Sequence, residues 1–258
     1  MSYPILVNGS AANGKSASMM FLDNQEGVLY LNCEPKPLPF RHRFVEYRIS
    51  DPDMVPAMFD KLLAVGTIKN PRSGDEVPIH TVVIDTITML MQLYENKYIK
   101  TAKNTQQAWG QYGDYLTSLL HKQSLFTADD REVPIQVVML SHIVSTEDTD
   151  TMIVTSRSGV KGSVGKVIGL EAFFTTVVYA KLVPMKYIEK YREDAKYLNV
   201  TEQEVRNKAK HVYVTLPHDG HEGDRIRSPI GMFGSNDLYM DNNIQTLINI
   251  QNNFFKSE

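Results

Sequence analysis

Residues 9–16 read Gly-Ser-Ala-Ala-Asn-Gly-Lys-Ser and match the phosphate-binding pattern G-x-x-x-x-G-K-[ST] at every fixed position. A short apolar run, residues 5–7, precedes this motif, and the helix-favouring segment 17–22 follows it. A Gly-rich turn between a strand and a helix directs its backbone N–H groups into one cavity, where the helix dipole adds positive potential. This context favours a phosphate loop over an ordinary Gly-containing turn, so we expect a nucleotide-binding α/β protein.

Each residue of this phosphate loop has an expected part. Lys15 would reach the β- and γ-phosphates of a nucleotide, and the Ser16 hydroxyl would bind Mg²⁺. The other residues would form the cradle around the phosphates: Gly9, Ser10, Ala11, Ala12, Asn13 and Gly14. The motif therefore predicts a nucleoside triphosphate and Mg²⁺ as the ligands of this segment.

The composition is that of an ordinary globular protein, with 258 residues, 42% apolar and 22% charged. The net charge is −3, so any contact with nucleic acid must come from a local patch or loop. The one cysteine, Cys33, excludes an internal disulfide and fits a reducing compartment. Because the sequence has neither a basic signal region nor a run of 18 apolar residues, we expect a cytoplasmic protein without a membrane span.

Apolar runs rich in Val and Ile alternate with helical patterns along the chain. We expect strands at 5–7, 28–31, 81–85, 135–140, 174–182 and 211–216, and helices at 51–65, 86–98 and 106–122. This alternation is typical of a mostly parallel central sheet flanked by helices on both faces. We expect residues 1–258 to form a single domain.

Two stretches break the alternation. Residues 144–166 are polar and rich in Gly and Ser, which predicts a long loop that is functional or disordered. Residues 186–210 carry both signs of charge and lack Gly and Pro, which predicts a helical surface insertion with a solvated face. Trp109, Tyr112 and Tyr115 recur at near-helical spacing, a pattern that favours core packing over a base-stacking platform.

Two carboxylates follow predicted strands. Asp85 ends the run TVVID, and a carboxylate at the tip of a buried strand can hold the Mg²⁺ shell, usually through water. The alternative is that Asp85 caps the following helix. Glu34 follows the second strand and would lie at the same edge of the sheet, within reach of a water aligned on the γ-phosphate. The alternative is that Glu34 is a solvated loop residue.

Other polar residues follow later strands. Ser141-His142 ends the fourth strand, where His142 can sense the γ-phosphate, or can be a satisfied histidine at the edge of the core. Arg225 and Arg227 alternate in DRIRSP and therefore project from the same face. They would pair with acids of this molecule or reach the triphosphate of a neighbouring subunit as arginine fingers.

The segment 144–166 also carries spaced cations on a flexible backbone, a combination that can follow the phosphates of a nucleic acid. These candidate DNA-binding residues are Arg157, Lys161 and Lys166. Because Glu147, Asp148 and Asp150 lie in the same segment, a solvent loop of mixed charge is the alternative.

The order of these features resembles the RecA-like ATPase core, and most closely the Sak-four group of small phage recombinase-type ATPases. The resemblance covers nearly the whole chain. It rests on VNGSAANGKS, LYLNCEP, HTVVIDTITML, VVMLSHIVSTEDT, VKGSVGKVIGLEAFFTTVVY and RIRSPIGMF. It implies a RecA-like P-loop NTPase core that hydrolyses ATP and acts on single-stranded DNA in phage recombination, replication or repair, in the host cytoplasm if the chain is phage-encoded.

The resemblance also implies roles for residues around the nucleotide. Glu34 matches the glutamate that activates water, and Asp85 matches the aspartate associated with Mg²⁺. His142 stands where RecA has a glutamine that couples nucleotide state to DNA binding, and here Ser-His replaces Asn-Gln. The loop 144–160 falls at the second DNA-binding loop, although this loop is partly acidic.

Further implications concern partners. Arg225 and Arg227 resemble a cationic pair that contacts ATP across a subunit interface, so the resemblance implies self-association as a ring or filament. The RecA helix that tethers neighbouring subunits has no counterpart here. A single-strand-binding protein is a possible companion in such systems.

Three other functions stay open at this point. The chain can be a nucleotide-gated DNA-annealing or scaffold protein with little turnover, or a helicase or helicase-loader ATPase. A small-molecule kinase is disfavoured because residues 17–40 contain no arginine to bind phosphates near the loop.

Overall fold

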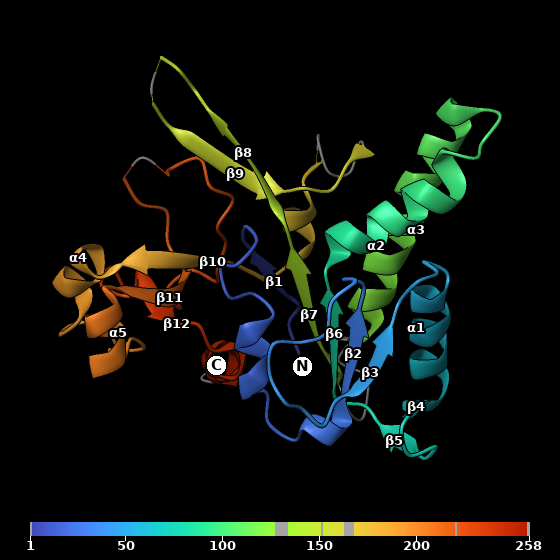
Figure 1. Cartoon of the computed structure of the whole chain (residues 1–258), viewed down its shortest axis with the longest axis horizontal. Helices are drawn as coiled ribbons and strands as arrows, with labels where there is room; N and C mark the ends of the chain where they lie inside the picture. The colour runs from blue at the N-terminus through green and yellow to red at the C-terminus, as the bar shows by residue number, and fades with distance from the viewer. Residues whose placement is uncertain (1, 127–133, 151, 163–167, 220, 257–258) are drawn as a thin grey trace.

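The computed structural model describes residues 2–126, 134–150, 152–162, 168–219 and 221–256, and it is built around an eight-stranded sheet (Figure 1). The strand order is β12-β11-β10-β1-β7-β6-β2-β3. The strands are β1 (Ile5–Asn8), β2 (Val28–Asn32), β3 (Val45–Arg48), β6 (Thr81–Asp85), β7 (Gln136–Ser141), β10 (Thr176–Pro184), β11 (Ala209–Val214) and β12 (Tyr239–Asp241). All neighbours from β10 to β3 are parallel, whereas β11 and β12 add antiparallel strands at one end.

Helices cover both faces of this sheet (Figure 1). One face is covered by α1 (Met54–Val65), α2 (Ile87–Tyr94) and α3 (Thr105–Phe126), with the π-helical turn η3 (Glu95–Ile99) after α2. The other face is covered by the 3₁₀ helix η1 (Ala17–Phe21) and by α6 (Ile244–Lys256). Shorter elements are η2 (Gln25–Gly27), η5 (Leu170–Phe173), α4 (Met185–Ile188), η6 (Glu189–Tyr191), α5 (Glu202–Asn207) and the hairpin of β4 (Thr67–Lys69) and β5 (Glu76–Pro78).

The two faces hold separate apolar cores because successive residues of a strand point to opposite sides. In β1, Leu6 packs into the core beneath α1, α2 and α3. Its neighbours Ile5 and Val7 pack into the core beneath η1 and α6. All three side chains are fully buried, as expected for a strand covered on both faces. The predicted α/β fold class, a mostly parallel central sheet flanked by helices on both faces, is therefore confirmed.

The segment 144–166 is not simply a loop, as we expected from its Gly and Ser content. It contains the antiparallel hairpin of β8 (Ile143–Glu147) and β9 (Val154–Ser158), which projects beyond the end of β7 (Figure 1). β-Branched residues at 143, 144, 146 and 153–155 have high strand propensity, and this propensity outweighs the flexibility of the surrounding residues. The candidate residue Lys166 lies outside the described residues.

Three other expectations are refined. The segment 17–22 forms only the five-residue 3₁₀ helix η1, because the chain turns at Asn24 with a left-handed φ of 46°. The insertion 186–210 contains short helices, and its last residues belong to β11. Core packing is confirmed for Tyr112 and Tyr115, whereas Trp109 is 37% exposed.

Helix α6 was not predicted, although its apolar residues recur at helical spacing. Ile244, Leu247 and Ile248 are buried against the sheet, and Gln251 contacts the Thr176 hydroxyl of β10. None of the helices in the described ranges is long and apolar enough to cross a membrane.

Candidate functional site

The phosphate loop connects β1 to η1 at the carboxyl edge of the sheet, and close contacts explain both of its fixed glycines. A Cβ atom on Gly9 would lie 2.7 Å from the Ala180 carbonyl oxygen of β10. Gly14 has a left-handed φ of +87°, and a Cβ atom there would lie 2.6 Å from Asn242 Nδ2. Gly9 meets a steric requirement, and Gly14 meets both a steric and a conformational one, so the loop can pack closely between β10 and the turn before α6.

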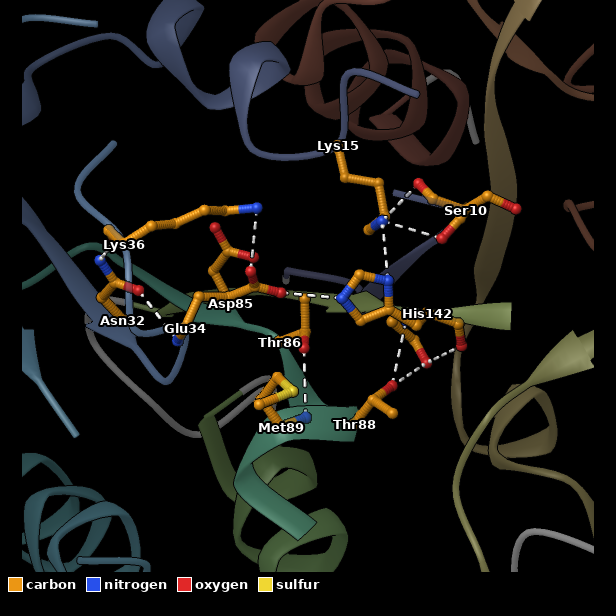
Figure 2. A network of polar contacts seen from close by, with 12 residues as sticks. Ser10, Lys15, Asn32, Glu34, Lys36, Asp85, Thr86, Thr88, Met89 and His142 are labelled. Carbon is orange, nitrogen blue, oxygen red and sulfur yellow. Dashed lines mark hydrogen bonds and ion pairs between the residues drawn. The ribbon is translucent and has the colours of Figure 1, made fainter. Parts of the chain in front are cut away.

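Lys15 points back over the loop that carries it (Figure 2). Its Nζ donates hydrogen bonds of 2.8 Å to the carbonyl oxygens of Gly9 and Ser10, and lies 3.4 Å from His142 Nδ1. The residue is only 6% exposed, and this burial lowers the pKa of Lys15 to about 8, while the Asp85 and Glu34 carboxylates oppose the shift. Phosphate oxygens are stronger acceptors than carbonyl oxygens, so this ammonium group can bind an incoming phosphate.

Asp85 ends β6 and is 2% exposed. Its Oδ2 accepts a 2.5 Å hydrogen bond from the Tyr30 hydroxyl, and its buried Oδ1 has no hydrogen-bond partner within the described ranges. Burial raises the pKa of the Asp85 carboxyl, and polar contacts with Tyr30 and Ser16 oppose the rise. The N-cap of α2 is Thr86, whose Oγ1 accepts from Met89 N, so Asp85 does not have the helix-capping role we considered.

The orphaned oxygen of Asp85 fits a divalent cation or its bound water. A buried carboxylate oxygen without a partner costs free energy, and Mg²⁺ prefers oxygen ligands and keeps several waters. The part of the chain that the structure describes has no cluster of three or more His, Cys, Asp or Glu side chains able to hold a metal. The remaining ligands of a cation beside Asp85 would therefore be the Ser16 hydroxyl, phosphate oxygens and water.

Glu34 is a half-buried, ion-paired side chain rather than the solvated loop residue we considered. Its carboxylate is only 10% exposed, with His142 Nε2 2.8 Å from Oε1 and Lys36 Nζ 3.0 Å from Oε2 (Figure 2). The hydrogen bond with His142, followed by the contacts with Lys36, lowers the pKa of Glu34 to about 2 although burial opposes the shift. Glu34 is therefore an ionised carboxylate throughout the physiological range.

His142 follows β7, and its backbone is fixed by hydroxyl groups. The His142 N–H donates to Thr88 Oγ1 at 3.0 Å, and the Ser141 hydroxyl donates to the His142 carbonyl oxygen at 2.9 Å. The ring lies between Lys15 and Glu34, which come from two other strand ends (Figure 2). The hairpin β8–β9 begins at the next residue, and Gly159 N, which follows β9, donates to the His142 carbonyl oxygen at the base of the hairpin.

A cavity of about 350 Å³ opens over these residues. It is lined by residues 11–17, Glu34, Lys36, Pro37, Pro39, His142 and His211. The sequence reasoning missed Lys36 and His211, and it missed Asn242, whose Nδ2 donates to the Gly14 carbonyl oxygen at 2.9 Å while its buried Oδ1 has no partner among the described residues. Lys36 lies two residues after Glu34, and this proximity in the sequence could have identified Lys36 as a residue of the cavity. His211 lies on β11, which is antiparallel to β10 and distant from the phosphate loop in the sequence.

Arg225 and Arg227 are not among the residues that line this cavity. Arg225 Nη1 lies 3.5 Å from Glu171 Oε2, and Arg227 Nη1 donates to the Ala172 carbonyl oxygen. Glu171 also accepts a 2.6 Å hydrogen bond from the Ser158 backbone N–H at the end of β9. Within one chain, Arg225 therefore pairs with an acid, which is the first of the two alternatives given for it above.

The described candidate DNA-binding cations lie on and after the hairpin. Arg157 is on β9, opposite Val144 of β8. Lys161 Nζ forms a 2.7 Å ion pair with Glu95 Oε2, so its charge is already partly compensated. The hairpin is tied to the rest of the molecule near Arg157, because Ser156 N donates to Asp224 Oδ1 at 2.8 Å.

No family model and no curated protein matches this sequence. Among solved structures, the chain is similar to the RadB recombinase, with 15% identity, a TM-score of 0.38, and coverage of 70% of this chain and 76% of that chain. It is also similar to a KaiC-like protein from the hyperthermophilic archaeon Pyrococcus horikoshii, with 10% identity, a TM-score of 0.40, and coverage of 82% and 77%. The sequence identity to both chains is low.

Proposed function

We propose that this protein binds Mg-ATP on residues 9–16 and hydrolyses it. The observation that carries the proposal is that three groups meet at the phosphate-loop cavity, which the loop and Glu34 line, while Asp85 lies buried beside them and interacts with the charges of both Lys15 and Glu34. These are the phosphate loop with Lys15, the buried Asp85 with an unpartnered oxygen, and the ionised Glu34. They come from the ends of β1, β6 and β2, which meet at the carboxyl edge of the sheet.

Each group has a distinct part in the proposed reaction. The loop N–H groups and Lys15 hold the phosphates, and Ser16 and Asp85 hold the cation shell. Mg²⁺, when bound, supplies positive charge that offsets the charge of the phosphate oxygens. Glu34 orients a water for in-line attack on the γ-phosphorus and accepts its proton. Because the pKa of Glu34 is about 2, its carboxylate is in the basic form that this step needs.

His142 connects the nucleotide to the projecting hairpin in this proposal. A phosphate that draws Lys15 away from the His142 ring also frees that ring to shift on Glu34. Because β8 starts at the next residue, movement of His142 would reach the hairpin directly. We propose that this hairpin and Arg157, together with Lys161 and Lys166, contact single-stranded DNA.

We further propose a RecA-like recombination, replication or repair protein, of phage type, that acts as an oligomer in the cytoplasm. Among the described residues, no arginine lines the phosphate-loop cavity, whereas arginine fingers accelerate such reactions by about 10³–10⁵. Arg225 or Arg227 of a neighbouring subunit would supply the missing charge. An isolated protomer should then be a poor ATPase.

A second candidate function is a nucleotide-gated annealing or scaffold protein with little turnover. The observation that favours it is that both oxygens of Glu34 are already engaged, by His142 and Lys36. Equilibrium binding of a fluorescent ATP analogue together with a single-turnover hydrolysis assay separates the two candidates. Binding followed by hydrolysis supports the ATPase, binding without hydrolysis supports the gated scaffold, and absence of binding contradicts both.

A further inference from the structure

A second cavity, of about 650 Å³, lies between the end of β10, the helices α4 and η6, residues 216–219, His221 and the segment 235–239. None of its lining residues lines the phosphate-loop cavity. We name it the tyrosine cleft after its aromatic side chains: Tyr187, Tyr191, Tyr239 and His218. Its volume lies in the range of ligand-binding pockets, about 300–1,000 Å³.

Two aromatic groups of the tyrosine cleft leave ring surface available to a ligand, because Tyr187 is exposed and Tyr191 is half-buried, whereas Tyr239 is buried. The rings of Tyr191 and Tyr239 pack edge to face, with centroids 5.4 Å apart and an interplanar angle of 87°. Tyr187 is 50% exposed. Exposed aromatic rings beside a pocket are stacking surfaces for planar groups, and every nucleobase has such a planar face.

Lysines lie over these tyrosine rings. Lys190 Nζ is 4.7 Å from the Tyr191 ring centroid, and Lys186 Nζ is 4.8 Å from that of Tyr187. Within the described ranges, neither lysine lies within ion-pair distance of a carboxylate, although the charge of Asp219 acts on Lys190, so both can bind phosphate. Asp219 also lines the cleft, and its negative charge reduces the local positive potential. The cleft therefore suits a few phosphates better than the many phosphates of a long duplex.

His218 supplies a neutral polar group at the wall of the cleft. Its Nδ1 atom is buried without a hydrogen-bond partner in the described part of the chain. Burial, followed by the charge of Lys181, lowers the pKa of His218 to about 4, so the ring is uncharged at neutral pH. The charge of Lys181 is itself paired with the buried Asp224 at 3.2 Å. The His218 ring is therefore an uncharged part of the cleft wall.

We propose that the tyrosine cleft binds one or a few nucleotides of single-stranded nucleic acid, with a base against Tyr187 or Tyr191 and the adjoining phosphates on Lys190 of the cleft wall and on Lys186, which lies beside Tyr187. Stacking requires an unpaired base, which excludes duplex as the preferred ligand. Asp224 joins the cleft to β9, because it pairs with Lys181 and accepts from Ser156 N. A strand seated in the cleft can therefore continue toward the hairpin. This inference rests on the proposed action on single-stranded DNA.

Fluorescence anisotropy with a labelled 20-nucleotide oligothymidylate tests the cleft, using the full chain with a non-hydrolysable ATP analogue. Tyr187→Ala should weaken binding about fivefold or more, because it removes a stacking ring, whereas Tyr187→Phe should stay within about twofold of wild type. Lys190→Ala should lower the slope of affinity against salt by about one. Both side chains are at the surface, and thermal unfolding and DNA-independent ATP hydrolysis should match wild type in all three variants.

The outcomes separate this inference from the proposed function. If Tyr187→Ala and Lys190→Ala bind the oligonucleotide with wild-type affinity, the cleft is not the binding site. If Arg157→Ala loses affinity in the same experiment, the strand binds to the hairpin alone. Equal loss in Tyr187→Phe and Tyr187→Ala also overturns stacking. If the wild-type protein hydrolyses ATP but binds no oligonucleotide, both the cleft and the action on DNA are wrong while the ATPase assignment stands. As an independent measure, an oligonucleotide with 5-iodouracil should crosslink within residues 181–191 or 216–239, and crosslinks confined elsewhere contradict the cleft.

Discussion

His142 Nε2 lies 2.8 Å from Glu34 Oε1, although the two residues are 108 positions apart in the sequence. Glu34 follows β2 and His142 follows β7, and β6 with Asp85 lies between these strands in the sheet. The parallel arrangement thus brings three strand ends together beside the phosphate loop. The same ring lies 3.4 Å from Lys15, so one imidazole contacts both the group that would bind phosphate and the group that would activate water.

The His142 contact has a consequence for pH dependence. It holds the pKa of Glu34 at about 2, below its ordinary value of 4.5. In His142→Ala that pKa should rise toward 4.5, so ATP hydrolysis should decline at a higher pH on the acid side than in wild type. Lys36→Ala should move the acid limb less, because the Lys36 side chain is 64% exposed. Identical acid limbs in kcat against pH for wild type and His142→Ala would contradict the assigned contact.

The same pKa also predicts a stability change. A carboxylate with a lowered pKa in the folded state stabilises the protein above its unfolded pKa, and this contribution is lost as the pH falls from about 4.5 to about 2. Urea unfolding across that window should show a smaller decline for His142→Ala than for wild type.

Lys15 should make nucleotide binding pH-dependent on the alkaline side. Its pKa is lowered to about 8, and only the protonated ammonium attracts phosphate. Affinity for Mg-ADP should fall above pH 8 by up to about tenfold per pH unit, which titration calorimetry from pH 7 to pH 9.5 measures. Because the unfolded chain keeps this proton up to about pH 10.5, the contribution of Lys15 to unfolding free energy should rise between pH 8 and 10.5. A flat affinity profile would show that Lys15 is not buried as described.

The hydrogen bond between Tyr30 and Asp85 should stabilise the fold. Tyr30→Phe leaves a buried carboxylate with one partner fewer and should lower the free energy of unfolding by about 1.5–3 kcal/mol. Tyr213→Phe is the matched control, because the buried Tyr213 hydroxyl bonds the neutral Ser18 hydroxyl and should cost about 1 kcal/mol. Denaturant unfolding of both variants checks this order. A larger loss in Tyr213→Phe would reverse our assignment of the stronger hydrogen bond.

The two glycines Gly14 and Gly66 predict different consequences of the same substitution. Both have a left-handed φ, +87° and +72°, but a Cβ atom on Gly14 would clash with Asn242, whereas nothing lies within 4 Å of one on Gly66. Gly66→Ala should cost about 1–2 kcal/mol of stability and leave ATP affinity unchanged. Gly14→Ala should distort the phosphate loop and weaken ATP binding by more than tenfold. Comparable ATP affinities for the two variants would contradict the loop geometry.

The sequence reasoning succeeded where local patterns and parallel topology decide the structure. The phosphate loop is a contiguous motif, and the polar residues at the carboxyl ends of β2, β6 and β7 were expected at one edge because parallel strands share their carboxyl ends. It did not find His211 or Asn242. The antiparallel strands β11 and β12 and the turn after them bring these residues to the loop. No local sequence pattern predicts that these strands pair beside β10. The hairpin β8–β9 was also missed, because its composition resembles that of a loop.

Phosphate release from Mg-ATP by wild type and by Glu34→Gln, measured across protein concentration with and without single-stranded DNA, tests the central claim most directly. Lys15→Ala serves as the control without nucleotide binding. The account predicts wild-type turnover that DNA stimulates and that rises more than linearly with protein, while Glu34→Gln binds ATP but barely hydrolyses it. Turnover of Glu34→Gln at the wild-type rate would contradict the catalytic site proposed here.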